Sequence, residues 1–473
     1  MNDLIIMKYG LPCRKLDLGV TPRFILLVGV IAMQENALGT KSIPTLFWQY
    51  SIPTVAAMLF LGVNTIVDGL FVGRYIGADA LAAVNIAMPF SSFLLAFSIV
   101  IGIGAQSLIG RKLGEGSGKE ANHVFTTALI LAGGIAFVFA GLGVLFSEPI
   151  AYVLGSSEKL MPLVSSYISY LGLFLPCLAL MMVLDYALKT VAMPVYAMWA
   201  LVVAVISHMA LNWLFIAVLD FGIQGAAIAT GIAFAVAFIM AALPFLRSHS
   251  MLKPFAGSWS QASAKSILYH GASEGVTELG TGVTTFLFNL TLMRYVGEMG
   301  VAAFTLISYL AFIGNNVLLG LSDGVGAIIS YNYGSCQMKR VKKALQLVAA
   351  SAGVIGIGMF AAIFIFAGDV ISLFLHEGNE DIVRFAVYGA KLYAFAFLVN
   401  GFNIVAAGYF TAIGSPGQAV LVALNKGVLW IVAGITILPV LFGVKGIWLT
   451  VPIAEFATLV LSGSLLYRHF RCS

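Results

Sequence analysis

Residues 51–77 read SIPTVAAMLFLGVNTIVDGLFVGRYIG, an apolar run long enough to cross a bilayer as a helix. One carboxylate, Asp68, lies in this run, about two turns from its far end. A charge inside the hydrocarbon core costs about 2.5–3.5 kcal/mol or more, so an intramembrane carboxylate usually has a partner or a function. Its side chain could also reach the outer interface. We favour a functional role.

The composition extends the membrane assignment to the whole chain. Of 473 residues, 60% are hydrophobic and 10% are charged, whereas soluble domains carry about 25% charged residues. Apolar runs of helical length without strict alternation predict spanning helices. The net charge of +5 is small for this length and suggests no nucleic-acid partner. The four cysteines lie far apart and predict neither a disulfide framework nor a metal site.

Twelve apolar segments of spanning length divide into two sets of six. We expect spans at residues 45–73, 80–110, 120–146, 161–188, 195–219, 223–246, 265–296, 301–331, 342–367, 384–413, 418–442 and 446–468. The sequence thus predicts an all-α integral membrane protein with an N-terminal lobe (41–246), a polar cytoplasmic linker (247–264) and a C-terminal lobe (265–473). Residues 1–40 form an N-terminal extension, and we expect translation of the native protein to begin at Met33, which leaves residues 1–32 untranslated.

The two predicted lobes repeat one another. Residues 74–77 (RYIG) match residues 294–297 (RYVG) at an offset of 220, and residues 221–222 match residues 442–443 at an offset of 221. Each lobe has an even number of spans, so both lobes have the same orientation. This pattern indicates a pseudo-symmetric parallel repeat about an axis along the membrane normal, with a substrate cleft between the lobes.

Lys and Arg residues indicate the orientation in the membrane. With the start of the first span in the cytoplasm, fifteen Lys and Arg residues lie on the inner side, Lys426 among them, and five lie on the outer side. Because an excess of Lys and Arg marks the cytoplasmic side, we expect both termini in the cytoplasm.

Four polar residues of the N-terminal lobe lie at the depth of Asp68. Asn64 is one turn before Asp68, and His208 and Asn212 share one face of the fifth span. Thr230 lies at a similar depth in the sixth span. Hydrogen bonds between helices would explain each residue alone. Together with Asp68 they suggest a cation or proton site.

The C-terminal lobe carries three candidate carboxylates for coupling or substrate binding. Glu274 and Glu278 lie one turn apart in the seventh span, where two like charges disfavour joint ionisation. Glu455 lies in the twelfth span and could line the lobe. By contrast, Asp185 and Asp323 lie near inner helix ends, from which they could reach the interface.

Motifs of other function classes are missing or misplaced. The chain contains no G-x-x-x-x-G-K-[ST], so ATP is not the evident energy source, and it contains no H-E-x-x-H. Residues 320–324 (GLSDG) fit G-x-S-x-G, but they lie inside a predicted span and not at a strand–turn–helix elbow. We interpret them as small residues for close helix packing.

Several stretches carry a resemblance to a known family: residues 67–73 (VDGLFVG), 77–84 (GADALAAV), 211–216 (LNWLFI), 225–230 (GAAIAT) and 409–414 (YFTAIG). On these residues the chain, over about residues 40–468, resembles the MATE (multidrug and toxic compound extrusion) transporters, and most of all the bacterial branch near the DinF and MepA groups.

The resemblance implies a secondary active exporter of the bacterial plasma (inner) membrane. Such an exporter expels organic cations or other amphipathic drugs in exchange for H⁺ or Na⁺, needs no cofactor beyond the transported ion, and alternates between inward- and outward-open states. We expect a monomer. The acidic position of the family's first lobe falls on Asp68, its fifth-span pair on His208 and Asn212, and its sixth-span threonine on Thr230.

His208 departs from the asparagine usual in this family. Na⁺ is a hard ion that prefers oxygen ligands, whereas an imidazole beside a carboxylate suits proton exchange near neutral pH. We therefore favour proton coupling at Asp68 and His208, with Na⁺ at Asp68 as the alternative. The second-lobe carboxylate of another bacterial group aligns with Gly282, one turn from Glu278.

Two alternative functions remain. A flippase for lipid-linked oligosaccharides or lipids shares this architecture but should have a strongly cationic central cleft, and few Lys or Arg residues lie in mid-span here. An intramembrane enzyme would need a further set of paired catalytic groups at one depth, and none is evident. We therefore favour multidrug export and expect no enzymatic activity.

Overall fold

The computed structural model of the protein describes residues 37–247, 250–372 and 380–472. These residues form helices and connections, and no strand occurs among them. Nine of their helices are long and apolar enough to cross a membrane, or up to eleven spans if each of two bent pairs forms one. The prediction of an all-α membrane protein is confirmed, and the count of twelve spans stays a prediction. Residues 1–32 and Met33 lie outside the described residues.

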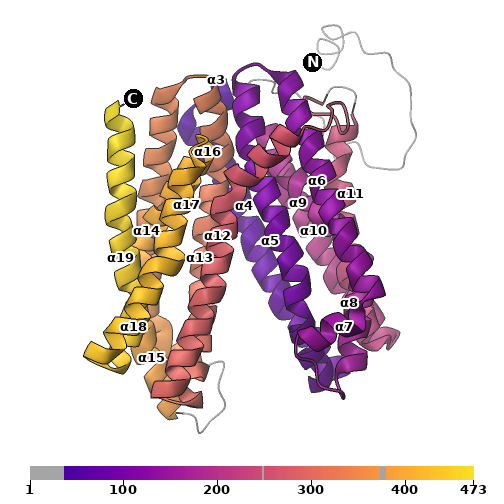
Figure 1. Ribbon diagram of the computed structural model, residues 1–473, viewed down its shortest axis with the longest axis vertical. Helices are drawn as coiled ribbons and strands as arrows, with labels where there is room; N and C mark the ends of the chain where they lie inside the picture. Colours follow the sequence, from indigo (N-terminus) through magenta and orange to yellow (C-terminus); the bar gives the residue numbers. More distant parts are fainter. Residues whose placement is uncertain (1–36, 248–249, 373–379, 473) are drawn as a thin grey trace, which may run out of the picture. The chain divides into compact units, whose positions relative to one another are not determined.

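The first half of the chain (residues 37–246) is drawn in indigo to magenta in Figure 1. Its long helices begin and end within a few residues of the predicted spans. They are α4 (Ile43–Phe71) with the π-helical turn η1 (Val72–Ile76), α5 (Ala78–Gly114), α6 (Gly118–Leu145), the bent pair α8 (Met161–Gly172) and α9 (Leu175–Thr190), α10 (Pro194–Asn212) with the π-helical turn η2 (Trp213–Val218), and α11 (Gly222–Ala242) with the 3-10 turn η3 (Leu243–Leu246). Two short helices, α3 (Ala37–Thr40) and α7 (Ser147–Val153), were not predicted.

The second half (residues 261–472) repeats this order of helices. It consists of α12 (Gln261–Tyr295), α13 (Glu298–Gly334), α14 (Met338–Ser372), the bent pair α15 (Glu380–Ala394) and α16 (Phe397–Ala412), α17 (Pro416–Leu424) and α18 (Trp430–Phe442) joined by the π-helical turn η4 (Asn425–Leu429), and α19 (Val444–Cys472). Helix α12 is not among the apolar candidates, because its Glu, Ser and Thr residues lower its hydropathy.

Corresponding turns support the internal repeat. Both bent pairs turn by 50°, one after Gly172 and the other after Ala394. Gly77 and Gly297, which precede α5 and α13, have φ angles of 121° and 83°. Glycine adopts positive φ without the steric cost that a Cβ imposes, which explains why it recurs at both positions.

The two halves contact one another through α4 and α5 on one side and α12 and α13 on the other. Backbones approach closely at glycines: a Cβ on Gly104 would lie 2.0 Å from the carbonyl oxygen of Ile267, and a Cβ on Gly271 would lie 1.9 Å from that of Val100. The C-terminal ends of α5 and α13 meet in the same way at Gly114. We call this end of the helices, from Gly104 to Gly114 on α5, the closed end.

Part of the predicted linker is held against the first half. The backbone amides of Lys253, Gly257 and Ser258 donate hydrogen bonds to side chains of α6. Helix α12 begins at Gln261, four residues before the predicted start of the seventh span, because the side chain of Ser260 caps its first turn.

Candidate functional site

The structure brings together the five polar residues predicted in the first half, which we call the Asp68 cluster. Helix α4 supplies Asn64 and Asp68, α10 supplies His208 and Asn212, and α11 supplies Thr230. Asn212 Nδ2 donates to Asp68 Oδ1 at 2.8 Å, and His208 Nδ1 lies 2.9 Å from Asn64 Oδ1. His208 and Asn212 are 4% and 1% exposed, so the cluster lies among packed helices.

The hydrogen bonds of His208 fit both protonation states of its imidazole. With the Asn64 amide oriented so that Oδ1 accepts, Nδ1 of His208 carries a proton. In the neutral ring, Nε2 accepts from Asn212 Nδ2 at 3.3 Å. In the charged ring, Nε2–H points toward Thr230 Oγ1 at 3.1 Å and Asp68 Oδ1 at 3.5 Å. The cluster can therefore hold one more proton without losing a helix contact.

The helix that carries Asp68 continues past residue 73, the predicted end of the first span. The π-helical turn η1 extends the helix to Ile76, eight residues beyond Asp68 and so about 12 Å along the axis. A second π-helical turn, η2, begins directly after Asn212. Such turns are frequent at functional sites. The Asp68 side chain is 21% exposed, so it contacts its partners and remains accessible.

Sequence reasoning missed one member of this site, Tyr167 on α8. Its side chain is buried, and it lies close to Thr230 and within electrostatic range of Asp68. A tyrosine in an apolar helix carries no signal of this role, because tyrosines are common there. Asn212 Oδ1 is also buried in the cluster and has no hydrogen-bond partner among the described residues.

Glu274 and Glu278 do not belong to the Asp68 cluster. They lie one turn apart on α12, the helix that packs against α5 of the first half. Glu278 is exposed and Glu274 is half-buried. Neither carboxylate has a hydrogen bond or ion pair with another described residue, although Asp323 and Lys426 lie within electrostatic range of Glu274. No other described side chain pairs with the charge of either carboxylate.

The side chains of Asp185 and Asp323 do not extend to the membrane–water interface, which corrects the expectation from the sequence. Both pair with Lys189 Nζ, at 2.7 Å from Asp185 and 2.8 Å from Asp323, and their side chains are 14% and 9% exposed. Lys189 and Asp185 lie on α9 and Asp323 lies on α13, so the ion pair joins the two halves. Pairing with a buried ammonium stabilises both carboxylates where they are.

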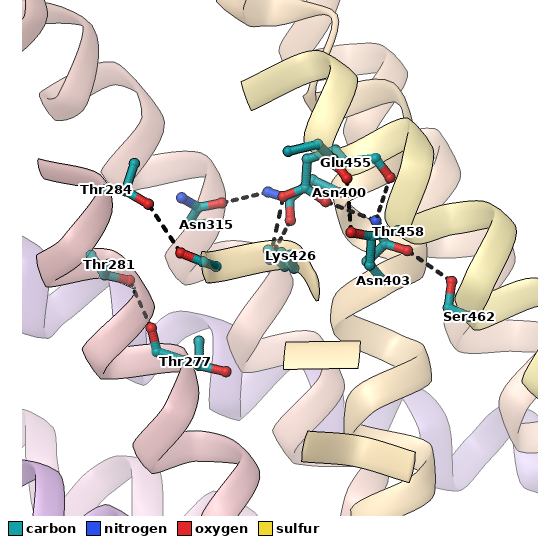
Figure 2. Close-up of polar contacts among 12 residues, drawn as sticks. Thr277, Thr281, Thr284, Asn315, Asn400, Asn403, Lys426, Glu455, Thr458 and Ser462 are labelled. Carbon is teal, nitrogen blue, oxygen red and sulfur yellow. Dashed lines mark hydrogen bonds and ion pairs between the residues drawn. The ribbon is translucent and has the colours of Figure 1, made fainter. Parts of the chain in front are cut away.

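Lys426 also occupies a different place from the one predicted. It lies in η4, ten residues into the helical segment that starts at Pro416, and not at the inner end of a span. Its Nζ lies 3.6 Å from Glu455 Oε1 and donates to Asn400 Oδ1 at 2.6 Å, as Figure 2 shows. Glu455 therefore does lie inside the second half, in contact with a lysine that the sequence places on the inner side of the membrane.

No metal centre is evident where the structure describes the chain, since no three His, Cys, Asp or Glu side chains gather there in a suitable group. The Asp68 cluster itself holds one carboxylate, surrounded by amide, hydroxyl and imidazole groups.

Comparisons with known proteins agree with this architecture. The MatE family pattern matches residues 53–214 and 276–436, one stretch in each half. The multidrug export protein MepA of Staphylococcus aureus is 25% identical over 418 residues, which cover 86% of this chain and 89% of MepA. MepA of Staphylococcus haemolyticus is 24% identical over 429 residues, which cover 88% of this chain and 92% of that protein.

Solved structures show the same fold. A MATE crystal structure in complex with MaL6 superposes with a TM-score of 0.86 at 21% identity, over 93% of this chain and 98% of that chain. An outward-facing multidrug resistance MATE family transporter of the MOP superfamily gives a TM-score of 0.85 at the same identity and coverage. Since the family pattern covers more than half of the chain, the chain belongs to the MatE family of multidrug efflux transporters.

Proposed function

We propose that this protein exports organic cations and other amphipathic drugs in exchange for protons bound at the Asp68 cluster. The observation that carries the proposal is the bonding of His208, whose Nε2 lies within 3.5 Å of Asp68 Oδ1, Asn212 Nδ2 and Thr230 Oγ1. An imidazole beside a carboxylate exchanges protons near neutral pH. Export of drugs is supported by the relatives, which are named multidrug export proteins.

The proposed cycle uses two conformations of the transporter. The closed end, where Gly104 and Gly271 bring the halves together, faces the cytoplasm, as the distribution of Lys and Arg predicts. In this state protons reach Asp68 and His208 from outside and the drug leaves. The halves then separate at the closed end, the protons pass to the cytoplasm and a new drug molecule binds. Coupling requires that protonation favour one conformation over the other.

Glu274 and Glu278 are the proposed contacts for a cationic drug. They are carboxylates without a partner among the described side chains, on a helix that packs against the other half. A lipophilic cation does not hold a tight water shell, so it could enter the membrane interior and neutralise these carboxylates. Both this site and the Asp68 cluster lie in one chain, so the proposal needs a single copy of the protein in the bacterial inner membrane.

Reconstituted transport tests the proposal. Purified protein in proteoliposomes is given ethidium and either a pH gradient or a Na⁺ gradient at fixed pH. We expect the pH gradient to drive ethidium transport, Asp68→Asn to abolish it, and Asp220→Asn, the same change at an exposed aspartate, to leave it intact.

Two results would contradict the proposal. Full pH-driven transport by Asp68→Asn would exclude the Asp68 cluster as the coupling site. Transport driven by Na⁺ at fixed pH would replace the proton with Na⁺ as the coupling ion.

A further inference from the structure

A second polar network lies inside the second half, built from side chains of α13, α16, η4 and α19 (Figure 2). Glu455 of α19 is 4% exposed, and its Oε2 accepts from Asn403 Nδ2 at 2.8 Å. Lys426 Nζ lies 3.6 Å from the other carboxylate oxygen and donates to Asn400 Oδ1 at 2.6 Å. Two further bonds complete the network: Asn400 Nδ2 donates to Asn315 Oδ1 at 2.7 Å, and Ser462 Oγ donates to Asn403 Oδ1 at 2.8 Å.

This network resembles the Asp68 cluster in composition and differs from it in charge. Each combines one carboxylate with amide and hydroxyl side chains. With a neutral imidazole at His208, the Asp68 cluster carries one negative charge and needs a mobile cation or proton. In the second network the ammonium of Lys426 cancels the charge of Glu455. A paired charge inside a membrane protein avoids most of the cost of an isolated one.

The backbone next to Lys426 is held against α12. The π-helical turn η4 packs against α12 so closely that a Cβ on Gly280 would lie 2.8 Å from the Cα of Gly427. Thr284 Oγ1 donates to the carbonyl oxygen of Gly427 at 3.5 Å. These contacts hold the residue next to Lys426 against α12, so the backbone from which the lysine side chain extends stays within reach of Glu455.

We propose that Lys426 is a tethered counter-cation for Glu455, which keeps this carboxylate ionised and unavailable to protons or Na⁺ throughout the transport cycle. The second half then binds no coupling ion, and exchange is confined to the Asp68 cluster. The proposal rests on the proton exchange proposed above. It makes Lys426 a positioning residue: it acts through Glu455 and sets how many ions the transporter carries.

The ionisable groups around Lys426 are few. Helices α17 and α18 contribute none, α19 contributes Glu455, and α12 contributes Glu274, which lies within electrostatic range of the ammonium. Tyr393 of α15 lies within electrostatic range of Glu455. Removal of the lysine therefore leaves Glu455 without its cation and beside the phenol of Tyr393, and a proton is then the available source of neutralisation.

Infrared difference spectroscopy of the purified full-length protein, acid minus neutral pH, tests the proposal through the band of protonated carboxylic acids. We expect the wild-type protein to show this band and the Glu455→Gln variant to keep it. We expect Lys426→Gln to add a second band, which disappears again in the Lys426→Gln/Glu455→Gln double variant. Lys426→Arg, which keeps the charge, should match the wild type. The Lys426→Gln/Glu455→Gln double variant again has no net charge in the network. It can therefore be measured even if Lys426→Gln alone fails to fold.

Transport in proteoliposomes supplies the second measurement. The double variant should retain pH-driven ethidium transport with the wild-type pH profile, whereas Lys426→Gln should shift that profile. Loss of the wild-type band and of pH-driven transport in Glu455→Gln would overturn the proposal, because Glu455 would then itself carry the proton. No added band in folded Lys426→Gln would overturn it as well.

Failure of the proposed function would look different. If Asp68→Asn retained the wild-type band and pH-driven transport, proton exchange at the Asp68 cluster would be wrong. The bands of the Lys426 and Glu455 variants would still report on the tethered cation.

Discussion

The ammonium of Lys189 on α9 lies 2.8 Å from Asp323 Oδ2 on α13, and this ion pair joins the two halves of the transporter. The same nitrogen lies 2.7 Å from Asp185 Oδ2, one turn earlier on its own helix. If the halves separate, Lys189 keeps Asp185 as a partner and Asp323 is released. A shared lysine thus allows the contact to open without leaving an ammonium unpaired in the membrane.

Loss of the Asp323 charge should favour opening of the closed end. Asp323→Asn removes the ion pair between the halves, and breaking a buried pair typically costs about 3–5 kcal/mol. With spin labels on Lys119→Cys and Lys339→Cys, both at exposed positions, we expect a larger fraction of long distances between the two labels in the Asp323→Asn variant. Asp185→Asn keeps the Asp323 contact and should shift the distances less. Equal shifts in both variants would show that the contact between halves has no special role.

A single methyl group should separate the halves at the closed end. In Gly271→Ala the new Cβ would lie 1.9 Å from the carbonyl oxygen of Val100, so one backbone must move. We expect a lower Tm and a longer distance between labels at the positions of Lys119 and Lys339. Gly282→Ala, on the same helix with no atom within 4 Å of its Cβ, is the matched control. A wild-type Tm in Gly271→Ala would contradict the tight packing.

Replacement of His208 by asparagine should change the coupling ion. His208→Asn removes the titratable imidazole and offers an amide oxygen beside Asp68 and Thr230, which suits Na⁺ better. We expect a Na⁺ gradient to drive ethidium transport in this variant and the pH profile of transport to flatten. His123→Asn, the same change at an exposed histidine of α6 whose ring accepts from the linker amide of Ser258, should keep the ion dependence of the wild type. Unchanged pH-driven transport in His208→Asn would remove the imidazole from the mechanism.

The carboxylates of α12 should determine affinity for cationic drugs. Glu274→Gln and Glu278→Gln each remove one negative charge from the proposed drug site. We expect each to weaken ethidium binding about tenfold, equivalent to about 1.4 kcal/mol, with little effect on an uncharged amphipathic drug. Fluorescence titration of purified protein measures both. Glu148→Gln, an exposed glutamate of α7, is the control. Equal losses for charged and uncharged drugs would indicate a structural role.

The depth of a residue in the membrane could be predicted from the sequence, because a helix has a fixed rise per residue and each residue's position in a span gives its place along the axis. That is why the sequence places Asp68, His208, Asn212 and Thr230 at one depth, and their side chains do meet in the structure. The sequence does not identify Tyr167, because its place beside the Asp68 cluster depends on how α8 is rotated against α11. The sequence places Lys426 at the inner membrane–water interface, because lysines near the end of a span commonly extend to that interface.

The sequence by itself determined the helical class, the limits of the long helices and the internal repeat. Each follows from local hydrophobicity and from turns that need glycine, such as Gly77 and Gly297. The tertiary structure alone decided which charges meet: Lys189 with Asp323, and Lys426 with Glu455. Such pairs depend on the rotation and separation of helices far apart in the chain, which the packing of all their side chains sets together.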